Sequence, residues 1–232
     1  MQERTLDTWE QFTAEMERLY RDHANRCVPG ASISSLLFRG HGDSEWKLKT
    51  TLERARPGQL SFIEYARIIY KIQPKLETLT GMKWETPTFS DYAAWAKNLK
   101  PVSEGELLAV PYLAYLRHHG FPSPLLDWTR SPYVAAFFAF RQLVEGAIHA
   151  SIWTYLEWVD SSHKSAITGQ PEIRGIGARF AVHKRHFMQQ SEYTVCTVDH
   201  SDGIRYAKHQ DVFDRNNDEQ DLLWKFNIPI SE

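Results

Sequence analysis

The chain reads HHGFPSPLLDWTRSP over residues 118–132 and continues as YVAAFFAF over residues 133–140. The first part is rich in turn-forming residues, yet it carries imidazole, hydroxyl, carboxylate and guanidinium groups, unlike an ordinary connection. The second part alternates small and large apolar residues, which suits a helix buried on several faces. Pro132 fits the first position of that helix and Ser131 fits its N-cap. We therefore expect functional groups held on a rigid helical support.

A second segment combines backbone shape with charge. An apolar run over residues 31–38 predicts a buried strand, and Arg39, Gly40 and His41 follow it. This arrangement places a planar cation beside a residue without a side chain, so that a phosphate or carboxylate can approach. The alternative is an Arg39 that pairs with a buried acid such as Asp127 and holds two loops together. We expect the two segments to share one site.

The pattern of apolar residues predicts an α+β fold with a helix-rich first half and a mixed or antiparallel sheet. The strand before Arg39 must pair with strands from the second half, so we expect one domain over residues 1–232. Within it we distinguish an N-terminal helix region (1–25), a motif-bearing core (30–200) and a C-terminal strand region (201–232). The expected helices cover residues 9–20, 62–72, a segment from residue 90, and 103–118. The expected strands cover residues 31–38, 46–48, 151–156, 193–198 and 222–228.

Composition excludes several classes of protein. The chain has 232 residues, of which 42% are hydrophobic and 13% aromatic, as in folded globular proteins. Its formal net charge of −2 gives no global field that would attract nucleic acid or an anionic membrane, so a polyanion would need a local groove. Cys27 and Cys196 lie far apart without metal-type neighbours. With no apolar run of membrane-spanning length and no signal-peptide core, we expect a cytoplasmic protein without a membrane partner.

Polar residues near the two motifs are further candidates for the site. If the backbone is extended there, the hydroxyls of Thr129 and Ser131 point the same way and Trp128 points oppositely. Such hydroxyls can orient a sugar or carboxylate, or simply cap a helix. Gln190 and Glu192 would likewise share one face of a strand, where a carboxylate can stabilise positive charge or discourage strand pairing.

The His118-His119 pair precedes a glycine turn and could reach a ligand. A metal would need further ligands at a suitable spacing, and the sequence offers none, so we expect no metal. Together with Asp127 the two histidines could instead act as general acid and base.

These motifs resemble those of the FRG domain family, which is named for the Phe38-Arg39-Gly40 type of tripeptide. The resemblance also rests on the stretch from His119 to Pro132 with the helix after it, and on residues 185–194, which include Gln189-Gln190. It spans roughly residues 30 to 200.

The chain is more distantly similar to ADP-ribosyltransferases of the Arg-Ser-Glu type. These enzymes use an Arg on a first strand, a Ser-containing strand followed by a helix, and a late Gln/Glu-x-Glu strand. The similarity implies a split sheet, NAD as substrate, and transfer of ADP-ribose to a protein or nucleic acid, as bacterial toxins and antiphage effectors do. It gives catalytic roles to Arg39, Glu192, Thr129 and Ser131. Our candidates for binding NAD are Arg39, Gly40, His41, His119, Asp127, Trp128 and Gln190.

The chain departs from the transferase pattern at two places. Asp127-Trp128-Thr129-Arg130-Ser131 replaces the usual Ser-Thr-Ser, and Ser191-Glu192 stands where many FRG-like sequences have Gly. Glu219 is a substitute carboxylate if the last strand is the relevant one. Asp127 and His119 have no clear part in the transfer itself, which leaves loop bracing or another chemistry open. Two other functions therefore remain: a non-catalytic module that binds a nucleotide or a protein, and a hydrolase of NAD or nucleic acid.

Overall fold

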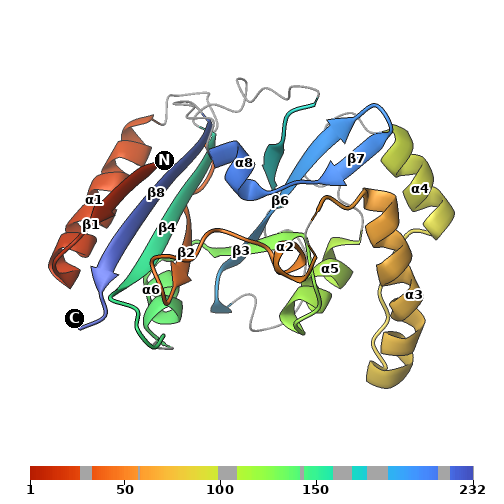
Figure 1. Cartoon of the computed structure of the whole chain (residues 1–232), viewed down its shortest axis with the longest axis horizontal. Helices are drawn as coiled ribbons and strands as arrows, with labels where there is room; N and C mark the ends of the chain where they lie inside the picture. The colour runs from red at the N-terminus through yellow and green to blue at the C-terminus, as the bar shows by residue number, and fades with distance from the viewer. Residues whose placement is uncertain are drawn as a thin grey trace.

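The computed structural model describes residues 1–26, 33–56, 58–98, 109–141, 144–158, 169–176, 188–213 and 220–231. Within these residues helices and strands form the predicted α+β fold (Figure 1). The helices are α1 (Trp9–Arg26), α2 (Thr51–Ala55), α3 (Phe62–Thr80), α4 (Phe89–Asn98), α5 (Val110–His118), α6 (Pro132–Phe140) and α8 (His209–Phe213). The strands are β1 (Gln2–Thr5), β2 (Leu37–His41), β3 (Leu125–Thr129), β4 (His149–Trp158), β5 (Glu172–Gly175), β6 (Ser191–His200), β7 (Gly203–Tyr206) and β8 (Gln220–Pro229).

The strands form one mixed sheet in the order β1-β8-β4-β2-β3-β6-β5, with β7 paired to β6. β1 runs parallel to β8, and the other neighbouring strands are antiparallel. β2, the first strand of the core, lies beside the late strand β4, which confirms the predicted non-local pairing. The sheet therefore cannot form until the two halves of the chain meet.

The pairing between β2 and β3 is the shortest in the sheet. These strands pair only through Phe38 and Thr129, whereas β2 pairs with β4 over five residues and β3 with β6 over five. Beyond that one pair, the guanidinium of Arg39 reaches across, and its Nη1 donates to the carbonyl of Asp127 at 2.6 Å. A side chain thus satisfies a carbonyl that lies past the end of the β2–β3 ladder. This side-chain hydrogen bond links the two strands where their ladder ends, and the transferase-like split stays an expectation.

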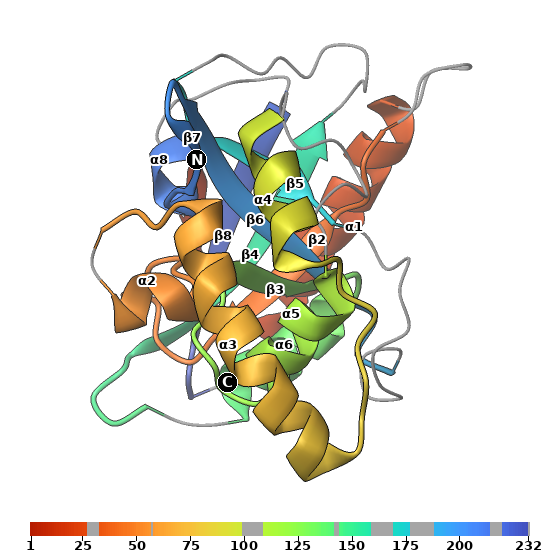
Figure 2. The same cartoon turned by 90° about the vertical axis from the view of Figure 1, so that its right-hand side faces the viewer.

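Helices cover one face of the sheet in two groups (Figures 1 and 2). α1 and α6 pack over β2, β4 and β8, where Phe12 and Ala135 meet Phe38 and Phe226. The helix expected at 9–20 is confirmed as α1, which continues to Arg26 and buries Phe12 and Met16 in this core. α1 is therefore part of the scaffold.

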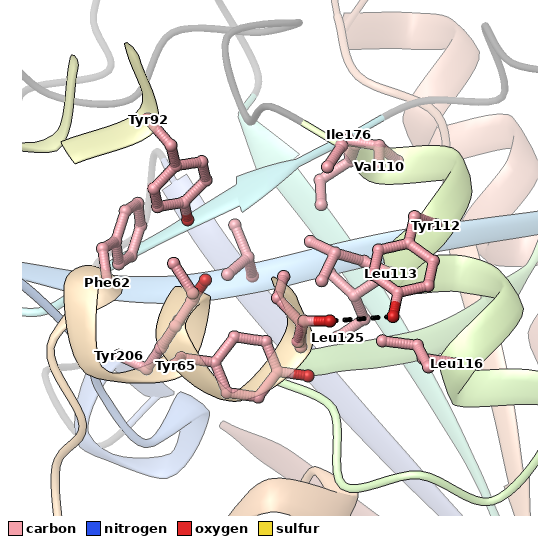
Figure 3. Close-up of a cluster of buried hydrophobic side chains, with 14 of the residues drawn as sticks. Phe62, Tyr65, Tyr92, Val110, Tyr112, Leu113, Leu116, Leu125, Ile176 and Tyr206 are labelled. Atoms are coloured by element: carbon pink, nitrogen blue, oxygen red, sulfur yellow. Dashed lines mark hydrogen bonds between the residues drawn. The ribbon is translucent and has the colours of Figure 1, made fainter. Parts of the chain in front are cut away.

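The second group, α3, α4 and α5, packs over β3, β6 and β7 (Figure 3). Its core is rich in tyrosine: Phe62 stacks on Tyr206 with ring centroids 4.5 Å apart, and Tyr65 meets the same ring edge-on. The buried hydroxyl of Tyr112 donates to the carbonyl of Ile69 at 2.9 Å. Burial raises the pKa of Tyr112, so this hydroxyl stays protonated and satisfied inside an apolar cluster.

The opposite face of the sheet is covered by α8 and by the segment before α2. Leu48, Trp128, Tyr155 and Phe213 belong to this third core. Trp128 stacks on Tyr155 with centroids 5.4 Å apart, and its Nε1 donates to Thr194 Oγ1 at 2.8 Å. The Trp128 indole is therefore anchored in the protein core.

Several element boundaries differ from prediction. The strand expected at 31–38 begins only at Leu37 and runs to His41; residues 31 and 32 lie outside the described residues. No strand forms at 46–48, because the Trp46 N–H closes a turn onto the Asp43 carbonyl at 3.2 Å. α3 continues past Pro74 to Thr80, and the first part of the helix expected at 103–118 lies outside the described residues.

Candidate functional site

A cleft of about 1170 Å³ opens where β2 and β3 separate. Both sequence segments singled out above contribute to its wall, together with the loop before α2, the end of α5, α6 and the start of β6. The residues that carry its chemistry are Arg39, His41, Glu45, Trp46, Lys47, Lys49, Arg54, His118, Asp127, Thr129, Ser191 and Tyr193. Residues 39 and 127 are thus neighbours in space, although 88 positions separate them in the chain.

Arg39 lies at the base of this cleft with its side chain 16% exposed. Its Nε donates to His41 Nε2 at 3.0 Å and its Nη1 to the Asp127 carbonyl at 2.6 Å, while the Asp127 carboxylate is 4.0 Å away. Burial lowers the pKa of Arg39 to about 10, and Asp127 opposes that shift. The guanidinium is still fully charged at neutral pH and is held in a fixed plane.

The carboxylate of Asp127 is fixed by an arginine that sequence reasoning missed. Arg117, in the last turn of α5, places Nη2 2.6 Å from Asp127 Oδ2. Arg117 is mostly buried, whereas the Asp127 side chain is 36% exposed to the cleft. Arg39 and Arg117 therefore lie on either side of the Asp127 carboxylate. Arg39 both contacts Asp127 and lines the cleft, so the two alternatives for Arg39 do not exclude each other.

His118 and Tyr193 form a second polar pair in the cleft. Tyr193 Oη lies 2.9 Å from His118 Nε2, with His118 exposed at the end of α5 and Tyr193 buried on β6. Burial, with a further contribution from Asp127, raises the pKa of Tyr193. Tyr193 therefore keeps its proton, and its hydroxyl is within hydrogen-bonding distance of His118 Nε2.

The outer wall of the cleft is cationic and aromatic. Lys47, Lys49 and Arg54 are exposed there, and Trp46 is 49% exposed. Across the cleft, Phe138 of α6 is 39% exposed. Four permanent cations, counting Arg39, face two carboxylates, Glu45 and Asp127, so the cleft is locally positive in a chain whose net charge is −2.

Gly40 has a structural role that the sequence did not reveal. A Cβ built on Gly40 would lie 1.9 Å from the Ala135 carbonyl oxygen and 2.7 Å from the Ala139 nitrogen, both in the backbone of α6. The absent side chain thus allows α6 to lie directly on β2. We expected Gly40 to let a phosphate approach the backbone; on this side α6 fills that space.

The hydroxyls of Thr129 and Ser131 do not form the expected pair. β3 ends at Thr129, whose Oγ1 donates to the Gln189 carbonyl at 2.7 Å and accepts from the Ser131 N–H at 3.1 Å. Ser131 is the N-cap of α6, where its hydroxyl accepts from Val134 N, and Pro132 follows at the first helical position. The predicted cap is confirmed. Thr129 lines the cleft, and Ser131 is not among its lining residues.

The structure also separates the late polar residues from the cleft. Glu192 is 4% exposed, is paired with Arg130 and lies opposite Trp128 in the sheet register. Gln190 has a φ of 47° in the turn before β6, so it does not share a strand face with Glu192. β6 pairs with β3 and β5, so Glu192 is not on an exposed edge. Glu219 lies outside the described residues.

His119 does not line the cleft. Its ring packs on Tyr115 of the same helix with centroids 4.2 Å apart. The signals that could have identified the missed residues were weak. Arg117 adjoins the histidine pair, and Lys47 and Lys49 alternate around Leu48, but neither pattern is specific.

Among the helices of the described ranges, none has the length and apolar character needed to cross a membrane. Cys196 is buried, and its Sγ donates to the Lys208 carbonyl at 3.4 Å; Cys27 lies outside the described residues.

Comparison with known proteins gives one match. No curated protein and no solved structure matches the chain. Residues 34–146 match the model of the FRG domain family, a range that contains β2, the Phe38-Arg39-Gly40 tripeptide, β3 and α6. Glu192 and Tyr193 lie beyond this range. Over residues 34–146 the chain is therefore similar to FRG domains.

Proposed function

We propose that the cleft binds NAD and that the protein is an ADP-ribosyltransferase-like enzyme, which transfers ADP-ribose to a protein or nucleic-acid acceptor. The observation that carries this proposal is the meeting of Arg39 and Asp127, from distant parts of the chain, at the base of one cleft. A bacterial toxin or antiphage effector is the setting that the transferase resemblance suggests for such an activity.

The electrostatics of the cleft favour a ligand with phosphates. Arg39 uses Nε and Nη1 for protein contacts, and among the described residues nothing bonds its Nη2. Lys47, Lys49 and Arg54 add three exposed cations on the outer wall. A planar guanidinium with nearby ammonium groups matches the oxygens of a diphosphate.

The size and aromatic content of the cleft favour a dinucleotide over a single phosphate. Small-molecule sites commonly enclose about 300–1,000 Å³, and this cleft is slightly larger at about 1170 Å³. Trp46 and Phe138 expose aromatic surface on which a base can stack.

The position of Asp127 supplies the chemistry that breakage of the nicotinamide bond requires. The bond between nicotinamide nitrogen and ribose C1′ breaks with its electron pair on neutral nicotinamide, leaving an oxocarbenium-like ribose. An acceptor nucleophile forms the new bond to C1′ and releases its proton to solvent. We propose that Asp127, fixed by Arg117, stabilises this cation in place of Glu192, which is buried beside Arg130.

The test follows NAD binding by calorimetry and nicotinamide release with labelled NAD, with and without cellular protein and nucleic acid. Arg39→Ala should lose binding; Asp127→Asn should bind NAD but release no nicotinamide; Glu192→Gln should keep both activities. Asp202→Asn, which changes an exposed carboxylate on the β6–β7 turn, is the matched control. Loss of release in Glu192→Gln with full release in Asp127→Asn would return the catalytic role to Glu192. Binding without release would favour a non-catalytic module, and no NAD binding at all would overturn the proposal.

Hydrolysis is the second candidate, and the His118–Tyr193 pair favours it. His118 and Asp127 both line the cleft, and an imidazole there could remove a proton from water, which would attack NAD or a phosphodiester. Free ADP-ribose formed without an acceptor, and lost in His118→Ala, would support this reading. His119→Ala is its matched control, because His119 packs on Tyr115 instead.

A further inference from the structure

His41 ends β2 and connects two parts of the cleft. The side chain is buried, with 7% of the residue exposed, between the rings of Trp46 and Trp153. Its Nε2 lies 3.0 Å from Arg39 Nε, and its Nδ1 lies 3.3 Å from the Trp46 carbonyl oxygen. One imidazole therefore contacts both the guanidinium at the base of the cleft and the loop that carries its cationic wall.

The two partners determine the tautomer. A guanidinium has only donors, so Nε2 of His41 must accept from Arg39. A backbone carbonyl has only an acceptor, so Nδ1 must carry the proton that bonds to Trp46. The contacts require a neutral His41 with its proton on Nδ1. Protonation of Nε2 would place two donors face to face and break the contact with Arg39.

The surroundings keep this imidazole neutral. Burial, reinforced by the charge of Arg39, lowers the pKa of His41 to about 3. Arg54 of α2 and Lys225 of β8 act in the same direction, and the hydrogen bond to Trp46 opposes them. The charged groups that affect His41 are thus all cations.

We propose that His41 is a positioning residue rather than a ligand-binding one: its acceptor nitrogen fixes the Arg39 guanidinium, and its N–H fixes the Trp46–Lys49 loop. The proposal rests on the proposed nucleotide site, because a bound diphosphate would meet both Arg39 and that loop. It predicts that the geometry of the anion site does not change between pH 8 and about pH 5, where an ordinary histidine titrates.

The first measurement needs no ligand. Nitrogen-15 NMR of the imidazole rings reports the tautomer and charge of His41 directly, and His41→Gln identifies its signals. We expect a neutral ring protonated at Nδ1 throughout the range from pH 8 to about pH 5. An imidazolium at pH 6, or a proton on Nε2, would overturn the proposal whether or not the protein binds NAD.

Two substitutions then separate the contacts. A glutamine amide can place its oxygen near the position of Nε2 and accept from Arg39, whereas an asparagine amide can place its nitrogen near Nδ1 and donate only to Trp46. His41→Gln should bind NAD within about twofold of the wild type, and His41→Asn should bind at least tenfold more weakly, as expected for loss of a hydrogen bond to a charged group. Equal affinities of the two folded variants would refute the role of the Arg39 contact. If neither variant folds, the NMR measurement on the wild type decides. Absence of NAD binding by the wild type, with the expected tautomer, would refute the nucleotide site alone.

Discussion

Gly40→Ala is the substitution for which the structure predicts the largest effect from the smallest chemical change. The new methyl group would lie 1.9 Å from the Ala135 carbonyl oxygen, whereas Cβ contacts below 3.0 Å are essentially never found. α6 must therefore retreat from β2 by about 1.1 Å. No side chain can move aside, because the obstructing atoms belong to helical backbone.

The size of the effect follows from what α6 covers. Ala135 and Ala139 pack in the same core as Phe38 and Ile152. A gap of about 0.5–1 Å already forfeits a quarter to a half of a dispersion contact, and overpacking alone costs about 1–3 kcal/mol. We expect the free energy of unfolding to fall by about 3 kcal/mol or more. The cleft should also change shape, since α6 forms part of its wall.

Urea unfolding followed by fluorescence measures this loss. Gly175→Ala is the matched control, because it adds the same methyl group to another strand and its Cβ would meet the Glu157 carboxylate, a side chain that can move. The control should lose about 1 kcal/mol. Equal losses in the two variants, or a Gly40→Ala protein as stable as the wild type, would refute the close approach of α6 to β2.

Three further predictions address the cap, the buried carboxylate partner and the pH dependence. Ser131→Ala removes the cap that accepts from Val134 N, so urea unfolding should show a loss of about 1 kcal/mol with unchanged ligand affinity, since Ser131 does not line the cleft. Arg117→Leu removes the 2.6 Å partner of Asp127 and should cost about 1–2 kcal/mol, whereas Arg205→Ala, which breaks an exposed pair, should cost less than about 1 kcal/mol in the same assay. Hydrogen bonds from Lys225 and Asn227 lower the pKa of Glu3 below its ordinary value of 4.5. The ionised Glu3 therefore stabilises the fold above pH 4.5, and this stabilisation is lost as the pH falls through the lowered pKa. The free energy of unfolding of Glu3→Gln should depend less on acid pH than that of the wild type, and an unchanged acid dependence would contradict this pairing.

Local signals predicted the helices better than the edges of the sheet. The start of α6 was predictable because its N-cap and its proline act within one turn. β1 was missed because Gln2–Thr5 is exposed and polar, and its strand conformation comes from parallel pairing with β8 at the other end of the chain. At residues 46–48 the sequence pattern predicted a strand that local hydrogen bonds prevent. Alternation was present, but the Trp46 carbonyl binds His41 and its N–H closes a turn.

Whether Asp127 or Glu192 faces the cleft depends on which face of the sheet each side chain points to, and the sequence alone does not determine this. Neighbouring residues on a strand point to opposite faces, so a shift of one position exchanges the side chains of a site with those of a core. Here Asp127 is paired in register with Tyr193, and Trp128 with Glu192. Asp127 and Tyr193 therefore share one face and both line the cleft, whereas Glu192 shares the other face with Trp128 and does not line the cleft. A spacing rule such as Gln-x-Glu assumes that the strand has already begun at Gln190, but the chain is still turning there, with a φ of 47°. Any transfer of function from the Arg-Ser-Glu pattern must therefore follow the register of β6 against β3, which places Asp127 and Tyr193 on one face of the sheet and Glu192 on the other.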